Sequence, residues 1–540
     1  MIFIDSNKRT QVLKYVFLAL AILYTFVFVV FGFGNYMDPF YWMSMYERYD
    51  VNSYMYCGTI ALGYVWMKCF GATVFSMRVL GWLLSVVSLA MPYFFLLEKT
   101  VRRKNVHWLA FAYCLLGYAV FQEFSPGSLS VFFISLLSIV LVNYFENRKY
   151  VAFIPLVMAL AIVSRFPNVV LLLFMPLIVL INGFLKKQKA VKVCVDECVV
   201  IVGTIVSSLL FYIVLGVDTS YDNLRLGFNQ EAQGNHSISV MIELLISNIM
   251  TLVYDVGVVL VVLFGLAINR HSKSWRKWIL PCVFAFCVFA YMKYKIGFKE
   301  WYNIHLHYFI SSLTIAFGLY GCVRGIIEKK SHTTLVILSL LLIGAVVPLG
   351  SNTAWLKLFP MYLCFLPFIV IRFFSPSYER SYIYPTMAVI CACSMAIFFT
   401  NPIGDYSIMD CRVSGTQPLY SGVYIPKEVD DYLNDVVSDC IEYGEKGNTV
   451  AVGYGAHLFH QLTHCNNIDY NDFWMRLDDT VFFESVRNQI EKNHPVVFCM
   501  SIPCHVDGNL GSTYFEKKLK EMGYGEVKRE ADCYSIYAQD

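Results

Sequence analysis

Long runs of residues without a charged side chain constrain this chain more than any other feature of its sequence. Tyr15–Phe33 and Cys198–Val217 are two such runs. As helices, each is long enough to cross the roughly 30 Å hydrocarbon layer of a bilayer. Only 15% of the 540 residues are charged and 57% are hydrophobic, whereas a soluble globular chain carries about 25% charged residues. These features exclude a cytosolic enzyme, a disordered chain and a secreted disulfide scaffold.

Hydropathy and helix-breaking residues together predict about thirteen transmembrane helices, and therefore a polytopic α-helical membrane protein. The spans are expected at 13–33, 76–97, 107–121, 128–145, 150–163, 168–184, 198–216, 245–268, 278–292, 304–325, 333–349, 358–373 and 382–400.

The distribution of charge predicts both the orientation in the membrane and a division into two domains. Most basic residues fall in the loops that lie on the cytoplasmic side if the N-terminus is cytoplasmic, which fits the positive-inside rule. From Asn401 onward the chain carries 11 basic against 22 acidic residues, whereas the first 400 residues carry 31 against 17. An odd number of spans then places the acidic part outside the cytoplasm.

We therefore predict a transmembrane domain over 1–400 and an extracytoplasmic soluble domain over 401–540. Strand-like and helical runs alternate in the second part, which is typical of a small α/β domain. Helices are expected at Glu428–Tyr443, Asp479–Lys492 and Ser512–Met522, and strands at Thr449–Gly453, at Pro495–Ser501 and twice within Glu526–Ala538.

Two predicted outer loops, 34–75 and 217–243, are long enough to build a functional site. The first is rich in Tyr, Trp and Met over Asp38–Gly71, which is typical of helices that lie along a bilayer surface. Asp38, close to the membrane, could act as a general base towards an acceptor hydroxyl, or help to hold a divalent ion. The alternative is that Asp38-Pro39 only caps a helix.

Other charged residues on the predicted outer side are also candidate site residues, but the sequence signal for each is less specific. Glu123 is the next outer carboxylate, with a solvated turn residue as the alternative. Arg165 is a cation on the side that usually lacks positive charge, and either phosphate binding or snorkelling to the interface would explain it.

The second long loop and a later outer segment add further candidates. Asp222 and Arg225 lie in the loop 217–243, and His305 lies in MKYKIGFKEWYNIHLH. Lys293, Lys295 and Lys299 place three cations within seven residues of an outer segment. Anionic lipid or a lipid-linked phosphate would explain this departure from the positive-inside rule.

The whole pattern resembles the GT-C superfamily of membrane glycosyltransferases, in the branch of aminoarabinose transferases, protein mannosyltransferases and bacterial RgtA/B/C/D-like proteins. The resemblance rests on an acidic residue after the first span, a long first outer loop and an acidic outer tail. It is clearest in WMKCFGATVFSMRVLGWLLSVVSL, with Phe70, Gly71 and Arg78, and in TVAVGYGAHLFHQLTH of the tail.

The resemblance implies transfer of a sugar from a polyprenyl-phosphate donor to an acceptor (lipid, glycan or protein) outside the cytoplasm. Asp38 would be the catalytic carboxylate and Glu123 the second acidic residue. Arg165, Arg225 and the Lys293–Lys299 group would bind the donor phosphate. Apart from the resemblance, Asp222 and His305 are kept as acceptor or loop candidates. The expected location is a bacterial inner membrane, with no nucleic-acid partner.

This chain departs from the family pattern in two ways: the first leaves its metal dependence open, and the second leaves the role of Glu123 open. The first loop has Asp38 followed by Pro39 rather than an Asp-Glu pair, and Ser-Pro-Gly-Ser follows Glu123 and Phe124 where many relatives place an Asp. A divalent cation (Mg²⁺ or Mn²⁺) therefore stays an open cofactor. Two other functions are kept as alternatives: a transporter or flippase of a lipid-linked saccharide, and a non-catalytic protein whose tail binds an envelope partner.

Overall fold

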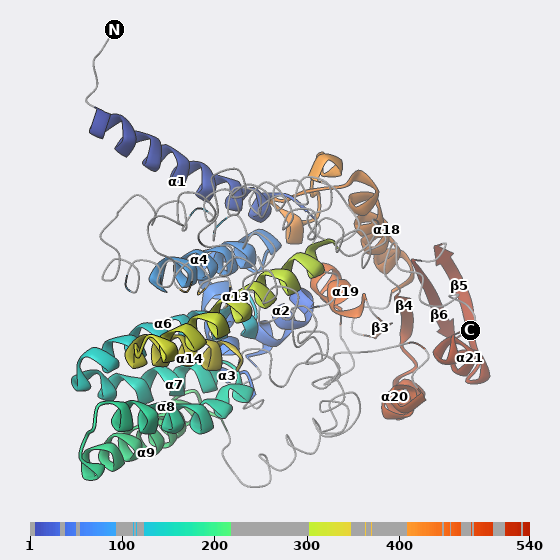
Figure 1. Ribbon diagram of the computed structural model, residues 1–540. Coiled ribbons are helices and arrows are strands. Elements are labelled where there is room, and N and C mark those ends of the chain that lie inside the picture. Colours follow the sequence, from blue (N-terminus) through green and yellow to red (C-terminus); the bar gives the residue numbers. More distant parts are fainter. Residues whose placement is uncertain are drawn as a thin grey trace. The chain divides into compact units, whose positions relative to one another are not determined.

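The computed structural model divides into two compact units, which are described separately (Figure 1). Unit 1 comprises 1–28, 50–62 and 79–398, and unit 2 comprises 29–49, 63–78 and 399–540. The structure describes residues 6–32, 38–49, 55–92, 124–217, 302–346, 408–444, 448–453, 455–465, 480–500, 513–530 and 533–539, together with residues 95, 112, 115, 362, 365, 369 and 477.

Unit 1 is helical throughout its described part. Its apolar core is formed mainly by α6, α7, α8, α13 and α14. The helices that lie wholly or partly in this unit are α1 (Ser6–Val30), α3 (Cys57–Phe70), α4 (Val74–Pro92), α6 (Pro126–Glu146), α7 (Ile154–Ser164), α8 (Leu171–Leu185), α9 (Ala190–Val214), α13 (Tyr302–Ile327) and α14 (Ser331–Gly344), with the short 3-10 helices η2 (Arg148–Phe153) and η3 (Phe166–Val170).

These helices confirm eight of the predicted spans as helical segments. The first, second and fourth to seventh spans coincide with α1, α4, α6, η2–α7, η3–α8 and α9, and the tenth and eleventh with α13 and α14. The predicted spans 245–268, 278–292 and 382–400 lie outside the described residues, as do most of 107–121 and 358–373. The number of thirteen spans therefore stays a prediction.

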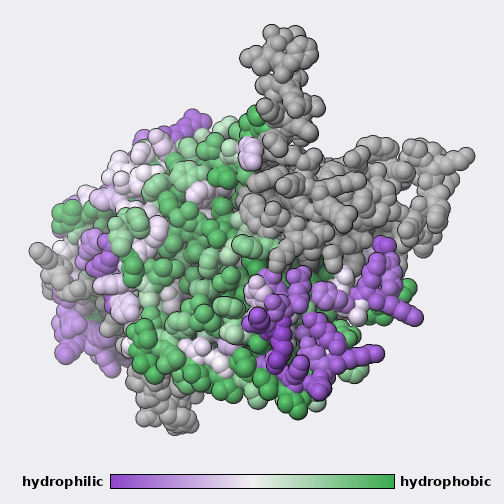
Figure 2. All heavy atoms as spheres, turned by 90° about the vertical axis from the view of Figure 1, so that its left-hand side faces the viewer, coloured by the Kyte–Doolittle hydropathy of each residue, from purple (hydrophilic) through white to green (hydrophobic). Residues whose placement is uncertain are grey.

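Several of these helices have the length and surface of membrane-spanning segments. Among the described residues, Val74–Pro92, Pro126–Glu146, Phe166–Leu185 and Ala190–Val214 are long and apolar enough to cross a membrane. Figure 2 shows hydrophobic residues over a broad part of the face that it presents. Exposed apolar side chains on α8 and α9 suit contact with lipid rather than water; they include Leu173, Leu177, Leu180, Phe184, Val202, Leu209, Leu210 and Ile213.

A buried carboxylate joins the end of α6 to the start of α9, two helix ends of unit 1 that are predicted to lie on the cytoplasmic side. Asp196, in the first turns of α9, is fully buried. It accepts a hydrogen bond from the Tyr144 hydroxyl at 3.0 Å and forms an ion pair at 2.7 Å with Arg148, which follows α6. Because a buried carboxylate is costly without such partners, the contacts fix the end of α6 beside the start of α9.

Replacing Asp196 with Ala is expected to destabilise unit 1 by about 2 kcal/mol, because the buried Tyr144 hydroxyl loses its acceptor. Thermal unfolding of the full chain in detergent measures the change. Glu328→Ala is the matched control, since it breaks the more exposed ion pairs that Glu328 makes with Arg324 and Lys330, which are worth little. Equal midpoints for the two variants would contradict the anchoring role of Asp196.

Unit 2 combines part of the first long loop with the acidic tail. Its tail elements are η7 (Ile408–Asp410), β1 (Val413–Ser414), η8 (Pro418–Tyr420), β2 (Tyr424–Ile425), α18 (Lys427–Tyr443), β3 (Thr449–Gly453), α19 (Ala456–Thr463), α20 (Thr480–Asn493), β4 (Val496–Met500), α21 (Tyr514–Glu521), β5 (Tyr524–Glu530) and β6 (Tyr534–Gln539). From the first loop it contains α2 (Asp38–Arg48) and the end of α3.

The tail forms the expected α/β layer structure. Its main sheet has the strand order β3-β4-β6-β5, with β3 and β4 parallel and the other two pairs antiparallel. β3 and β4 are buried along their whole length, as their uninterrupted apolar sequences predict. Both strands, the three predicted helices and the final strand pair are confirmed to within two residues at each end.

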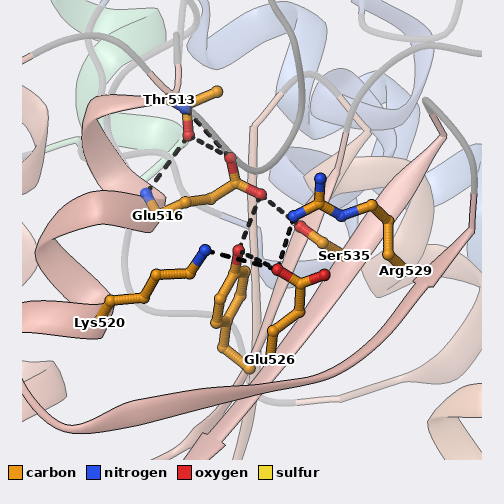
Figure 3. Close-up of polar contacts among 7 residues, drawn as sticks. Thr513, Glu516, Lys520, Glu526, Arg529 and Ser535 are labelled. Atoms are coloured by element: carbon orange, nitrogen blue, oxygen red, sulfur yellow. Dashed lines mark hydrogen bonds and ion pairs between the residues drawn. The ribbon is translucent and has the colours of Figure 1, made fainter.

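A buried glutamate links α21 to the sheet (Figure 3). Thr513 and Glu516 form a reciprocal capping box at the start of α21. The Glu516 carboxylate also accepts hydrogen bonds from Ser535 at 2.6 Å and from Tyr537 at 3.2 Å, both on β6. The same side chain therefore caps the helix and fixes it to the strand.

Candidate active site

The chain segment that leads to Asp38 is held in place by a buried arginine of unit 2. Arg78, in the first turns of α4, is fully buried and donates to the carbonyl of Gly32 at 2.8 Å. The Gly32 N–H in turn donates to the Tyr424 carbonyl of β2 at 2.9 Å, and the rings of Phe31 and Tyr424 stack 5.2 Å apart. The backbone six residues before Asp38 is therefore fixed by both α4 and the tail.

The family-like segment around Gly71 supports this arrangement. Gly71 ends α3 with a φ of +87°, a backbone conformation that suits glycine after a helix. The Trp66 indole then donates to Ser76 in the first turn of α4 at 3.0 Å. The turn between α3 and α4 is thereby closed, which sets the position of Arg78.

Helix α2 begins at Asp38, with Pro39 in its first turn, as the Asp-Pro pair predicts. Whether the carboxylate caps the helix is not tested, because the Asp38 side chain lies outside the described part of the structure. The two helices α2 and α3 confirm the prediction of helices in the first loop, and their position at a bilayer surface stays a prediction.

Helix α19 of the tail packs against α2 within unit 2 (Figure 1). Gln461 donates to the hydroxyl of Ser44 at 3.2 Å and to the carboxylate of Glu47 at 3.1 Å. The ring of His457 meets that of Tyr41 edge-on, with centroids 5.2 Å apart. The helix that carries Asp38 is thus held directly by the tail.

His457 is a buried titratable group beside α2. Its side chain is enclosed, with the residue only 7% exposed. Burial, and after it the positive charge of Arg48 and the nearby His460, lower the pKa of His457 from 6.5 to about 4. Burial also lowers the pKa of His460, although Glu47 acts against this shift. His457 is therefore a neutral imidazole at pH 7.

The lowered pKa of His457 predicts a loss of stability in mild acid. Between pH 6.5 and about 4 the unfolded chain binds a proton at this ring and the folded chain does not, so the free energy of unfolding falls by about 3 kcal/mol over that window. Pulse proteolysis of the full chain in detergent at pH 7, 5.5 and 4.5 would measure this fall in the free energy of unfolding. His457→Gln should remove this part of the pH dependence, and identical profiles for wild type and variant would refute the assignment.

Arg165, in unit 1, lies at a turn on which part of the first loop packs. It joins α7 to η3 and is only 3% exposed, so it does not lie on the surface of the helix bundle. The Thr59 hydroxyl of α3 donates to the Ser164 carbonyl at 2.8 Å, and the Phe166 N–H donates to the Met55 carbonyl at 2.8 Å. The turn that carries Arg165 is thus bound to 55–59 of the first loop.

The same turn is also connected to the start of α6. Asn168 is fully buried and donates to the Ser130 hydroxyl at 2.8 Å and to the Ala161 carbonyl at 2.7 Å. Helix α6 begins with a capping box formed by Ser125 and Ser128. In unit 1 the turn with Arg165 therefore lies beside the helix that directly follows the predicted Glu123 segment.

The other predicted site residues are not placed by the structure. His305 lies in α13, but its side chain is outside the description. The remaining candidates, Glu123, Asp222, Arg225, Lys293, Lys295 and Lys299, lie outside the described residues. Within the described ranges, no group of three or more His, Cys, Asp or Glu side chains could hold a metal ion.

Three residues that the structure connects to α2 and its approach are not among the predicted site residues. Arg78 belongs to the family-like stretch around Gly71, and His457 and Gln461 belong to the family-like segment of the tail. The spacing of His457, His460 and Gln461, which places polar side chains on one face of a short helix, is the signal that could have identified them.

No family model matches the chain, and no curated protein matches its sequence. Several solved structures, however, are similar to this chain. The oligosaccharyltransferase of Archaeoglobus fulgidus in complex with Zn and sulfate is similar with a TM-score of 0.50 and 14% identity, over 97% of this chain and 73% of the other.

Two further structures are similar at lower TM-scores. Archaeal oligosaccharyltransferase AglB from Archaeoglobus fulgidus, in complex with an inhibitory peptide and a dolichol-phosphate, gives 0.45 at 12% identity, over 91% of this chain and 69% of that one. ArnT from Cupriavidus metallidurans bound to undecaprenyl phosphate gives 0.44 at 11% identity, over 97% of both chains.

The first of these similarities defines the class of fold. This chain shares the fold of the archaeal oligosaccharyltransferase over nearly its whole length. The predicted combination of a polytopic helical membrane part with a C-terminal domain is confirmed at the level of the fold.

Proposed function

We propose that the protein is an integral membrane glycosyltransferase that transfers a sugar from a polyprenyl-phosphate donor to an extracytoplasmic acceptor, either lipid, glycan or protein. The observation that carries the proposal is the support of α2, which begins at Asp38. Arg78 of α4 holds the chain six residues before this helix, and α19 of the tail packs against the helix itself. A carboxylate on a fixed helix just after a spanning segment suits chemistry on a donor that cannot leave the bilayer.

The proposed reaction is a displacement at the sugar carbon attached to phosphate. The acceptor oxygen forms the new bond, its proton passes to the Asp38 carboxylate, and the carbon–oxygen bond to phosphate breaks. The polyprenyl phosphate leaves with the electron pair. Fixed positive charge stabilises the developing negative charge on the phosphate, and Arg165 supplies such a charge inside unit 1.

The remaining predicted residues have proposed roles around this reaction. Glu123 is proposed as a second acidic residue of the catalytic centre. Additional cations for the donor phosphate are Arg225, Lys293, Lys295 and Lys299, and the acceptor side would include Asp222 and His305. A divalent cation (Mg²⁺ or Mn²⁺) would be held, if used, by carboxylates among these candidates and Asp38.

The proposed organisation in the membrane follows from the charge pattern. The transmembrane domain occupies 1–400, with about thirteen spans and a cytoplasmic N-terminus, and the α/β domain of 401–540 lies outside the cytoplasm. The bacterial inner membrane is the proposed location, since the donor and the envelope acceptor meet there.

Sealed proteoliposomes containing the purified full chain and a labelled lipid-linked sugar separate this function from that of a flippase. A glycosyltransferase should leave intact donor in its original leaflet and, when acceptor is added, should move the labelled sugar to the acceptor and release polyprenyl phosphate. Movement of intact donor to the other leaflet, with no bond cleavage, would instead establish the transporter alternative.

A further inference from the structure

Two cysteines of the tail come together where α18 and α19 pack against each other in unit 2. Cys440 lies in the last turn of α18, and Cys465 lies two residues beyond the end of α19. They are 25 residues apart in the chain. Both are half-buried thiols in the structure. Helix packing, not sequence spacing, therefore makes them neighbours.

The hydroxyl of Thr463, the last residue of α19, connects the two thiols. The side chains of Cys440 and Cys465 each form a hydrogen bond with it. The Cys465 N–H also donates to this hydroxyl at 3.4 Å, and the hydroxyl donates to the Phe459 carbonyl at 2.8 Å. The two sulfur atoms are thus gathered around one hydroxyl group that α19 itself holds in place.

Other cysteines of the tail lie in different surroundings. The tail contains six: Cys411, Cys440, Cys465, Cys499, Cys504 and Cys533. Cys411 lies beside Gly32 and Arg78, and Cys499 is enclosed in β4 beside Glu516. Six cysteines allow fifteen complete pairings, and the packing of α18 against α19 favours those that join Cys440 to Cys465.

The surroundings of the pair suit a disulfide better than two thiols. Burial raises the pKa of Cys440, and burial, with a smaller effect of the Cys440 thiol, raises the pKa of Cys465 to about 12. Such thiols are poor nucleophiles at neutral pH, which argues against a reactive role. A disulfide has no ionisable group and loses nothing by burial. It would form while the tail folds, when both thiols are exposed and have ordinary pKa values.

We infer that Cys440 and Cys465 form a disulfide that ties α18 to α19; this rests on the extracytoplasmic location proposed above for 401–540, since such compartments are oxidising. The oxidant is a protein disulfide of that compartment. One cysteine thiolate attacks it to form a mixed disulfide, and the second thiolate displaces the oxidant. One S–S bond forms, and the oxidant's own S–S bond is reduced to two thiols, which take up the two electrons and the two protons.

The disulfide would reinforce the helix that supports α2. Helix α19 has only eight residues and no side-chain cap at its start, and Gln461 on it bonds to Ser44 and Glu47 of α2. A covalent link just after its last turn joins this short helix to the longer α18. The surface that holds the helix beginning at Asp38 would thereby be fixed from within the tail.

Peptide mapping of the full chain tests the inference. Protein taken from membranes is denatured in N-ethylmaleimide, which blocks free thiols, and is digested with trypsin without reductant. Trypsin cleaves after Lys427, Lys446 and Arg476, so Cys440 and Cys465 fall on separate peptides. Mass spectrometry should find the two peptides joined, lighter by two hydrogen atoms than their sum, and separated by a reductant.

Three variants control this result. In Cys440→Ser the thiol of Cys465 should carry maleimide, and in Cys465→Ser that of Cys440 should carry it, because each has lost its partner. Cys533→Ser removes another half-buried cysteine of the tail and should leave the joined peptides unchanged. Maleimide on both Cys440 and Cys465 of the wild-type chain, or a link from either to a different cysteine, would overturn the inference.

The location of the tail is measured separately from its thiols. Alkaline phosphatase fused after Asp540 is active only outside the cytoplasm, since it needs disulfides of its own. An active fusion together with maleimide on both cysteines would refute the disulfide and leave the proposed location standing. An inactive fusion would refute the location and the inference with it. Neither readout uses sugar transfer, so the proposed catalytic function is tested independently.

Discussion

Replacing Asp38 with Asn is expected to lower the rate of sugar transfer by about 100- to 10,000-fold, the usual contribution of a general base. Asn keeps the size of the side chain but cannot accept the acceptor's proton. The initial rate with a polyprenyl-phosphate sugar, measured at matched protein levels in membranes, is the readout. Donor binding should persist, because the cations proposed for the phosphate are unchanged.

Two further variants test whether the loss of activity is specific to the carboxylate of Asp38. Asp38→Glu keeps a carboxylate and should retain more activity than the Asn variant. Asp435→Asn makes the same chemical change at an exposed residue of α18 and should transfer sugar at the wild-type rate. Full activity in Asp38→Asn would exclude Asp38 as the base and move attention to Glu123 or Asp222.

Glu516→Ala is expected to destabilise the tail by about 4 kcal/mol, a large part of the stability of a small domain. The carboxylate is fully buried and accepts from the Thr513 hydroxyl at 2.7 Å, from Ser535 and from Tyr537 (Figure 3). Its removal leaves two hydroxyls of β6 buried without this acceptor and removes the half of the capping box that the Glu516 side chain contributes at the start of α21. Proteolysis of the full chain in detergent should cleave the tail of the variant much faster.

Glu521→Ala in the same helix is the matched control for this change. Glu521 is an exposed residue, and its ion pair with Lys518 is worth little. Its effect should stay below about 0.5 kcal/mol. If Glu516→Ala resists protease as well as Glu521→Ala does, the buried network does not stabilise the tail.

Much of the fold could be predicted because the distribution of apolar residues within one helix or strand is a local property of the sequence. The runs that become α6, α8 and α9 are apolar around the whole helix, as expected where lipid or other helices surround them. In the tail, Thr449–Gly453 is short, apolar and followed by glycine-rich sequence, and its position as a strand is confirmed residue for residue.

Helix α19 was not predicted, for a physical reason. It has eight residues, too few to be stable alone, and it has no side-chain cap at its start. Its stability comes from packing against α2 and the tail. Since α2 lies more than 400 residues earlier in the chain, no local pattern could reveal that His457 contacts Tyr41.

The candidate site was predictable only in part. Asp38 follows from its place after the first apolar run, and the Asp-Pro pair indicates the helix that it begins. The role of Arg78 in fixing the approach to that helix depends on a contact with Gly32, 46 residues away. Such contacts arise from tertiary packing, which pattern alone does not encode.

The fate of the bond between sugar and phosphate is the most direct test of the central claim. Purified full chain in nanodiscs, given limiting polyprenyl-phosphate sugar and an extract of envelope acceptors, should form one polyprenyl phosphate for each sugar attached to acceptor. Asp38→Asn should form neither product. If the donor stays intact with the wild-type chain while a known lipid-linked glycosyltransferase consumes it in the same preparation, the protein is not the enzyme proposed.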